Sequence, residues 1–122
     1  MADRRAAERH GRRSETLAAL LLRLKLYRIL GRRVRTPLGE IDLIARSPNG
    51  VLCFIEVKAR AEESQIADAI GLRQRGRIAR AAEIWLAGRP GLARNGIRFD
   101  VVSVARGRMP RHLRDAWRSD DR

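Results

Sequence analysis

The segment GEIDLIARSPNGVLCFIEVKAR, residues 39–60, decides the fold. Apolar and polar residues alternate over 40–46 and again over 51–60, which predicts two β-strands because successive side chains of a strand point to opposite faces. Between the runs, Pro48 suits the second position of a type I turn and Gly50 suits a left-handed residue. We therefore expect an antiparallel hairpin closed by a three-residue loop.

The loop 48–50 fixes which residues of the two strands face each other. Counting back from it places Asp42 opposite Glu56, and Glu40 opposite Lys58. One face then carries only apolar residues: Ile41, Leu43, Ala45, Val51, Cys53, Ile55 and Val57. The other face carries Ile44, Leu52 and Phe54 near the turn and the four charged residues away from it. A slip of one residue would move the charges onto the apolar face, so the pattern itself favours this register.

Two carboxylates on directly opposed residues are an unusual feature of this hairpin. Side chains at such positions lie about 5 Å apart, where two negative charges repel by about 3 kcal/mol at an effective dielectric constant near 20. A divalent cation would convert this repulsion into binding, because Mg²⁺ prefers one or two carboxylates together with water and phosphate oxygens. The alternative is a salt-bridged sheet surface, in which Lys58 lies between Glu40 and Glu56.

The rest of the chain predicts further elements around the hairpin. In chain order these are a helix over 14–25 capped by Ser14, a strand over 27–35, a helix over 72–87, a strand over 97–104 and a short helix over 113–118. The first helix has an apolar stripe of Leu17, Leu20, Leu21 and Leu24. Glu15 shares a different stripe with Ala18, Ala19 and Leu22, and can also face the sheet. In the second helix, Ile78, Ala82, Trp85 and Leu86 form one stripe.

These elements predict one α/β domain with a central mixed sheet flanked by helices, in the order αβββαβ. We divide the chain into a flexible basic segment over 1–13, a folded domain over 14–106 and a C-terminal tail over 107–122. A single cysteine, Cys53, excludes an internal disulfide, and the absence of a run of about 18 apolar residues argues against a membrane span. Without a recognisable secretory signal, we expect a cytoplasmic protein.

The net charge points to a polyanionic partner. The 122 residues include 27 Lys and Arg against 14 Asp and Glu, for a formal net charge of +13. Most of the excess is Arg, whose guanidinium binds phosphate oxygens with two hydrogen bonds. We expect nucleic acid, with DNA favoured, although an Arg-rich genome gives the same bias.

Gly39-Glu40-Ile41-Asp42-Leu43-Ile44 followed by Phe54-Ile55-Glu56-Val57-Lys58 resembles the YraN family of small bacterial proteins. That family is similar to Holliday-junction resolvases and to restriction-endonuclease-like nucleases, whose signature is Asp, a spacer and Glu-x-Lys. The resemblance covers about residues 11–105 and extends to Tyr27-Arg28-Ile29-Leu30, Arg73-Gln74 and Arg98-Phe99-Asp100-Val101-Val102. It implies a restriction-endonuclease-like fold.

The resemblance also implies residue roles. Asp42 and Glu56 would bind Mg²⁺, for which Mn²⁺ can substitute, and Lys58 would be the catalytic lysine. Glu15 matches a first-helix glutamate that reaches the metal, or else complements the helix dipole. Gln74 matches a polar helix residue near the catalytic site, or else is simply solvated. Phosphate contacts are expected from the start of the second helix: Arg73, Arg75, Arg77 and Arg80.

The favoured function is a metal-dependent endonuclease that hydrolyses phosphodiester bonds in DNA, with branched or structured DNA as one substrate class. The alternative is a non-catalytic nucleic-acid-binding protein that retains the nuclease-like fold. A third interpretation is a basic protein attached to ribosomes or another assembly, and the Asp, Glu and Lys set argues against it. The resemblance leaves open whether the chain forms a homodimer, and the role of Glu40 is open between a ligand neighbour and a partner of Lys58.

Overall fold

The computed structural model describes the backbone of residues 2–59 and 70–119, with side chains described from Arg12 onwards. Its elements are α1 (Ala2–Leu24), β1 (Arg28–Thr36), β2 (Gly39–Arg46), β3 (Leu52–Ala59), α2 (Leu72–Ala87), the 3₁₀ turn η2 (Pro90–Ala93), β4 (Ile97–Val104) and β5 (Arg111–Trp117). The expected bounds of α2 and β4 are confirmed, and those of β1, β2 and β3 are confirmed to within one residue at each end.

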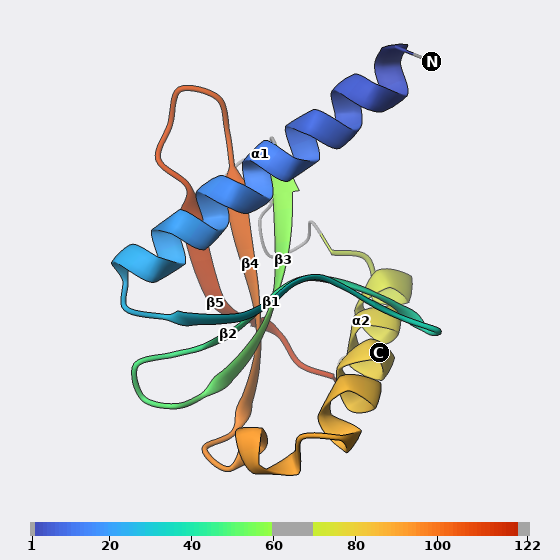
Figure 1. Cartoon of the computed structure of the whole chain (residues 1–122), viewed down its shortest axis with the longest axis vertical. Coiled ribbons are helices and arrows are strands. Elements are labelled where there is room, and N and C mark those ends of the chain that lie inside the picture. The colour runs from blue at the N-terminus through green and yellow to red at the C-terminus, as the bar shows by residue number, and fades with distance from the viewer. Residues whose placement is uncertain (1, 60–69, 120–122) are drawn as a thin grey trace.

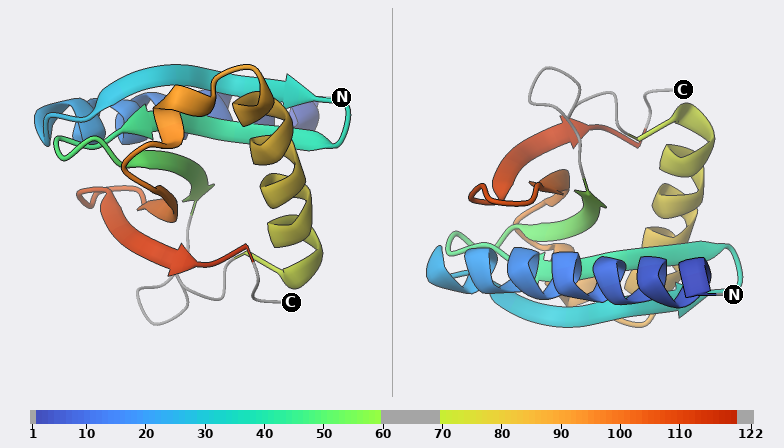
Figure 2. Two further views of the ribbon diagram at one scale, coloured as in Figure 1. Left: turned by 90° about the horizontal axis from the view of Figure 1, so that it is seen from below. Right: turned by 90° about the horizontal axis from the view of Figure 1, so that it is seen from above.

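The strands form one sheet in the order β1-β2-β3-β4-β5 (Figure 1). β3 and β4 are parallel and the other neighbouring pairs are antiparallel, so the predicted mixed α/β sheet is confirmed. The parallel pair follows from α2, which carries the chain from the end of β3 back to the start of β4. α1 and α2 lie on different sides of the sheet, and the sheet curves around α2 (Figure 2).

Each face of the sheet has its own hydrophobic core. Against α2 pack Ile44, Leu52, Phe54, Phe99, Val101 and Trp117, together with Ile78, Ala79, Ala81 and Ala82 of the helix itself. Against α1 pack Leu43, Ala45, Cys53, Ile55, Val102 and Val104. The predicted division of the hairpin into two faces is therefore confirmed, with one correction. Ile41 joins the α2 core rather than the α1 core, at a point where β2 is paired with β1 and the described ladder to β3 has ended.

The first helix differs from the prediction at its start and on its buried face. It begins at Ala2, so Ser14 is an interior helical residue and not the cap. Residues 2–13 have no apolar period, so the sequence pattern does not predict this extension. The face against the sheet is that of Ala18, Ala19 and Leu22, whereas Leu17, Leu20 and Leu24 are 45%, 51% and 71% exposed. The small alanine side chains allow the helix to approach the sheet closely.

A further correction concerns the C-terminal segment, where a fifth strand replaces the predicted short helix over 113–118. Phe99 pairs with Trp117 and Val101 with Leu113, so β5 accommodates two more residues than β4 between these pairs. Asp115, with a φ of 51°, lies inside this bulge. The bulge turns Leu113, Ala116 and Trp117 toward the same core. Their helix-like spacing in the sequence is therefore produced by an irregular strand.

Neither helix, within the parts of the chain that the structure describes, combines the length and the apolar character needed to cross a bilayer.

Candidate active site

The β2–β3 hairpin has the register that the sequence predicts. Leu43 faces Ile55, and the pairing continues to Arg46 opposite Leu52. Ser47 and Val51 close the loop with a backbone hydrogen bond of 2.9 Å, and Gly50 has the left-handed φ of 83° that the turn requires. One step beyond Leu43 and Ile55, the same register places Asp42 opposite Glu56.

At Asp42 and Glu56 the two strands are joined by side chains instead of by the regular ladder. The backbone N–H of Asp42 donates to Oε2 of Glu56 at 3.0 Å, and the backbone N–H of Val57 donates to Oδ2 of Asp42 at 2.8 Å. From here β2 stays paired with β1, while β3 stays paired with β4. The sheet thus opens between its second and third strands, and the two carboxylates lie in the opening.

Burial raises the pKa of both carboxyl groups. The pKa of Asp42 rises to about 6, first through burial and then through the charge of Glu15, although the Val57 N–H and Lys58 oppose the change. The pKa of Glu56 rises to about 8, first through burial and then through the charge of Asp42. The two groups are also close enough to hydrogen-bond each other when one carries a proton. A cation bound between the two carboxylates would relieve their mutual repulsion.

Gln74, from the first turns of α2, links the lysine to the buried carboxylate. Lys58 Nζ donates to Gln74 Oε1 at 3.2 Å, and Gln74 Nε2 donates to Glu56 Oε1 at a long 3.4 Å. The stripe of α2 that buries Ile78 and Ala82 also directs Gln74 toward the sheet. The structure therefore brings together four of the predicted site residues: Asp42, Glu56, Lys58 and Gln74.

Glu15 and Glu40 are held by arginines of β1. Glu15 is buried, and Arg33 Nε donates to its two carboxylate oxygens at 3.0 and 2.8 Å. The negative charge of Glu15 still contributes to the raised pKa of Asp42. Glu40 is exposed and lies 3.6 Å from Arg35. No sequence pattern indicated a role for Arg33, whose backbone has an unusual positive φ of 49°.

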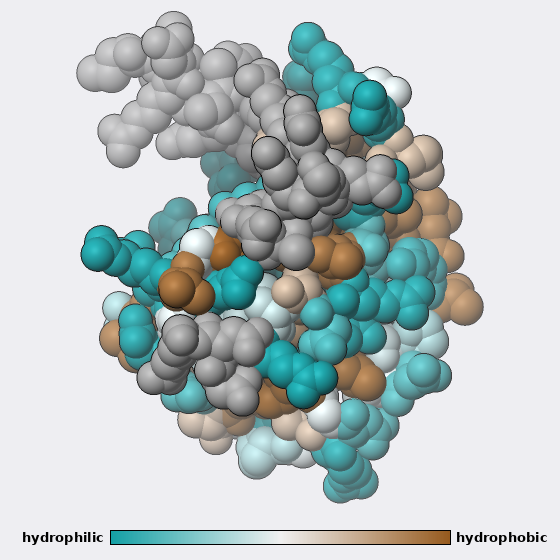
Figure 3. Space-filling model, turned by 180° about the vertical axis from the view of Figure 1, so that it is seen from behind, coloured by the Kyte–Doolittle hydropathy of each residue, from teal (hydrophilic) through white to brown (hydrophobic). Residues whose placement is uncertain are grey.

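The four arginines of α2 divide into two groups. Arg73, Arg77 and Arg80 are exposed and follow one stripe of the helix. Arg75 is engaged within the fold, because its Nε donates to the carbonyl of Ile70 at 2.8 Å and its guanidinium lies 6.0 Å from the Trp117 ring centre. Hydrophilic side chains cover much of the described surface on the face shown in Figure 3. The exposed arginines are thus available to an external anion.

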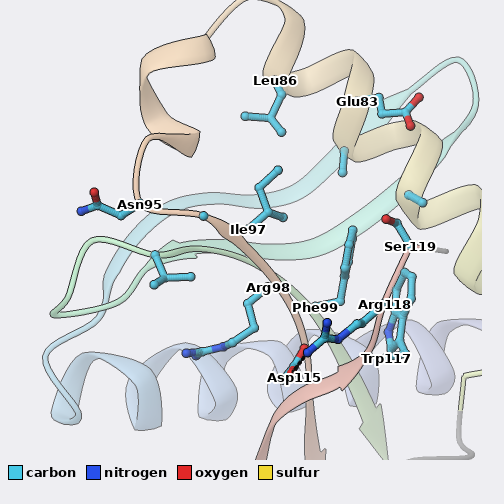
Figure 4. A pocket seen from close by; sticks show the side chains of 14 residues that line it. Glu83, Leu86, Asn95, Ile97, Arg98, Phe99, Asp115, Trp117, Arg118 and Ser119 are labelled. Atoms are coloured by element: carbon cyan, nitrogen blue, oxygen red, sulfur yellow. Dashed lines mark ion pairs between the residues drawn. The ribbon is translucent and has the colours of Figure 1, made fainter. Parts of the chain in front are cut away.

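A cavity between described elements lies away from the carboxylates. It has a volume of about 740 Å³ and is formed between α2, β4 and β5, with Phe99 and Trp117 stacked on one wall (Figure 4). Neither Asp42 nor Glu56 lines it, so we assign the chemistry from the carboxylates and not from cavity size. Among the described residues, no group of three or more His, Cys, Asp or Glu side chains is arranged to hold a metal. The acidic pair Asp42 and Glu56 therefore remains the candidate.

A small α/β domain with a five-stranded mixed sheet and two helices is consistent with a nuclease-like fold. The chain belongs to the family described as Uncharacterised protein family UPF0102, whose model matches residues 14–104. It is 54% identical to a UPF0102 protein of Maricaulis maris over 93% of this chain and 89% of the relative. It is 50% identical to a UPF0102 protein of Agrobacterium fabrum over 93% of each chain. The resemblance to the YraN family, which is this family, is confirmed.

Proposed function

We propose that the chain is a metal-dependent endonuclease that hydrolyses phosphodiester bonds in DNA. The observation that carries the proposal is the opening between β2 and β3, where Asp42 and Glu56 meet beside Lys58. A sheet built only for stability would not place two adjacent carboxylates, one buried and one half-buried, at the same point. Strongly perturbed carboxyl groups with a specific charged partner are a feature of catalytic sites.

The donor set fits a hard divalent cation. Asp42 and Glu56 would hold the ion, since both offer carboxylate oxygens from adjacent strands and their mutual repulsion is relieved by positive charge. Hydrogen bonds from the Val57 and Asp42 backbone N–H groups fix the orientation of both carboxylates in advance. When bound, Mg²⁺ supplies Lewis-acid polarisation of the scissile phosphate.

Lys58 supplies the remaining charge at the site. Gln74 accepts one of its three N–H donors and so fixes the position of the ammonium group. The other two donors, which make no hydrogen bond to a described residue, would contact an attacking water and the phosphoryl oxygens, on which negative charge accumulates in the transition state. Gln74 is a positioning residue in this arrangement, because it acts through Lys58 and Glu56.

The substrate is proposed from charge and from the family resemblance. A formal net charge of +13 suits a polyanion, and the exposed Arg73, Arg77 and Arg80 extend from the same helix as Gln74. Branched DNA is the favoured class because the residue pattern is similar to that of Holliday-junction resolvases. In this proposal, Mn²⁺ substitutes for Mg²⁺ at the carboxylates.

A cleavage panel tests the proposal. Linear, flapped, four-way and single-stranded DNA are incubated with and without Mg²⁺, using wild type, Asp42→Asn, Lys58→Ala and the matched control Glu40→Gln. We expect metal-dependent cleavage by wild type and by the control, and loss of cleavage with retained DNA binding in the two site variants. DNA binding without cleavage of any substrate by wild type would favour a non-catalytic nucleic-acid-binding protein instead.

A further inference from the structure

A second polar cluster lies on the α1 side of the sheet and extends from the middle of β4 to the hairpin loop. Its centre is Asp100 of β4, which is fully buried and receives both Nε and Nη2 of Arg98 at 2.8 Å. His112 Nε2 contacts the same carboxylate at 2.7 Å, and the side chain of His112 is only 2% exposed. Asp100 therefore has both an arginine and a histidine as partners.

The cluster continues outward to Lys25, just after α1. Lys25 Nζ lies 2.7 Å from His112 Nδ1. A lysine ammonium can only donate, so Nδ1 is the acceptor and the ring proton is on Nε2, which donates to Asp100. Arg98 Nη2 also donates to the hydroxyl of Tyr27 at 2.7 Å. The basic groups are therefore held in place by a buried network.

These groups surround a small cavity of about 150 Å³. Lys25, Arg98 and Arg114 line it together with Tyr27 and the hairpin-loop residues Ser47, Pro48 and Asn49. Since a liquid water occupies about 30 Å³, the cavity has room for one tetrahedral oxoanion and a little water. Its three cationic side chains face one carboxylate, Asp100, which already forms an ion pair with Arg98 and a hydrogen bond with His112.

The positive charges at the cavity are not balanced by the described residues. No ion pair to a carboxylate is found for Lys25 or Arg114 in the part of the chain that the structure describes. Burial lowers the pKa of Lys25, and the charges of Arg114 and Arg98 lower it further, although Asp100 opposes them. An anion in the cavity would offset this repulsion.

We infer that this cavity is a phosphate-binding site, formed by Lys25, Arg98 and Arg114 and closed by the hairpin loop. From Val51, which also lines the cavity, to Glu56 the strand advances by five residues, a distance of about 17 Å along the strand. The ligand is a phosphate group, either a phosphodiester of nucleic acid remote from the cut or a free phosphate. The site uses no residue of the proposed cleavage chemistry, so it stands if that proposal fails.

The test is a titration of the full chain with inorganic phosphate in EDTA at constant ionic strength, followed by ¹H–¹⁵N NMR. We expect saturable shifts at the amides of Tyr27, Ser47 and Asn49. Arg114→Ala, and Lys25→Gln, which keeps a donor for His112, should each weaken binding about tenfold or more. The matched control Arg106→Ala removes the same charge from the β4–β5 loop and should change the affinity less than twofold. Asp42→Asn should bind phosphate like wild type.

A DNA duplex then distinguishes the two sources of phosphate. If the ligand is a backbone phosphodiester, Arg114→Ala reduces the slope of log affinity against log salt by about 0.9, whereas Arg106→Ala does not. If the ligand is free phosphate, Arg114→Ala loses phosphate binding and keeps the duplex slope of wild type. The inference is overturned if phosphate causes no saturable shift around the cavity, or if Arg106→Ala weakens binding as much as Arg114→Ala.

Discussion

Replacing Asp42 with Asn should make the fold more stable at neutral and alkaline pH in the absence of metal. Asn has nearly the same shape, and its carbonyl oxygen can still accept the Val57 N–H that now donates to Oδ2. The substitution removes the charge of half-buried Asp42, which lies beside the buried carboxyl group of Glu56. Burial and neighbouring charge raise the pKa of Asp42 from 3.8 to about 6. At about 1.4 kcal/mol per pKa unit, this shift corresponds to a cost of about 3 kcal/mol for ionising Asp42 in the folded chain.

The sign of the pH dependence follows from the raised pKa values. The unfolded chain loses the Asp42 and Glu56 protons near pH 4, whereas the folded chain holds them to about pH 6 and about pH 8. Between these limits the folded state binds more protons, so wild-type stability falls as the pH rises. The advantage of Asp42→Asn is therefore absent below about pH 4 and complete above about pH 8, where it should raise the melting temperature by on the order of 10 °C.

Urea denaturation of both proteins in EDTA, from about pH 4 to about pH 8, measures this difference. Glu40→Gln is the matched control, because it removes a carboxylate that is exposed, and it should change stability by less than about 0.5 kcal/mol. Added Mg²⁺ should stabilise wild type and not Asp42→Asn. The reasoning is refuted if Asp42→Asn is less stable than wild type at about pH 8, or if the difference does not vary with pH.

Three further predictions concern the catalytic lysine, the basic helix and the core. Gln74→Leu should lower kcat for DNA cleavage about tenfold or more and leave KM nearly unchanged, because it releases Lys58 without touching the substrate. Arg80→Ala should weaken DNA binding similarly across sequences and reduce the salt slope by about 0.9, measured by fluorescence anisotropy. Leu22→Ala should destabilise the fold by about 2–5 kcal/mol in urea, whereas Leu20→Ala should cost less than about 0.5 kcal/mol.

Each of these predictions has a contrary result. A Gln74→Leu enzyme with normal kcat and a raised KM would mean that Gln74 binds substrate and does not position Lys58. An unchanged salt slope in Arg80→Ala would remove that arginine from the DNA interface. Equal destabilisation by Leu22→Ala and Leu20→Ala would contradict the buried face of α1 described above.

The hairpin could be predicted in detail because three local constraints agree on it. An odd loop ending in Gly50, the apolar face and the charged residues all require the same register. The bounds of α2 follow from a regular apolar stripe that ends at Gly88. Because the hairpin register alone determines that Asp42 faces Glu56, this acidic pair could also be predicted from the sequence.

What the sequence did not predict depends on tertiary structure. For α1, the leucine stripe is more hydrophobic than the alanine stripe, but the sheet selects the side chains that permit close packing. For β5, the bulge at Asp115 changes the alternation, so a strand shows helical spacing. The pairing of Glu15 with Arg33 joins α1 to β1, and no sequence pattern indicates either this contact or the positive φ of Arg33.

The roles of some site residues likewise depend on tertiary contacts that the sequence does not predict. Gln74 was named only from the family resemblance, and the structure places it in contact with Lys58 and Glu56 because α2 packs across the opening in the sheet. Arg75 belongs by sequence to the basic start of α2, but its contacts with Ile70 and Trp117 depend on how the helix meets β5.

Calorimetric titration with Mn²⁺ tests most directly whether Asp42 and Glu56 form one cation site. Wild type and Glu40→Gln should each bind one Mn²⁺ at about pH 8, more tightly than at about pH 6, because binding displaces the proton that the raised pKa of Glu56 retains. Asp42→Asn and Glu56→Gln should each lose this binding. Saturable binding of equal strength in all four proteins would place the metal elsewhere and contradict the account.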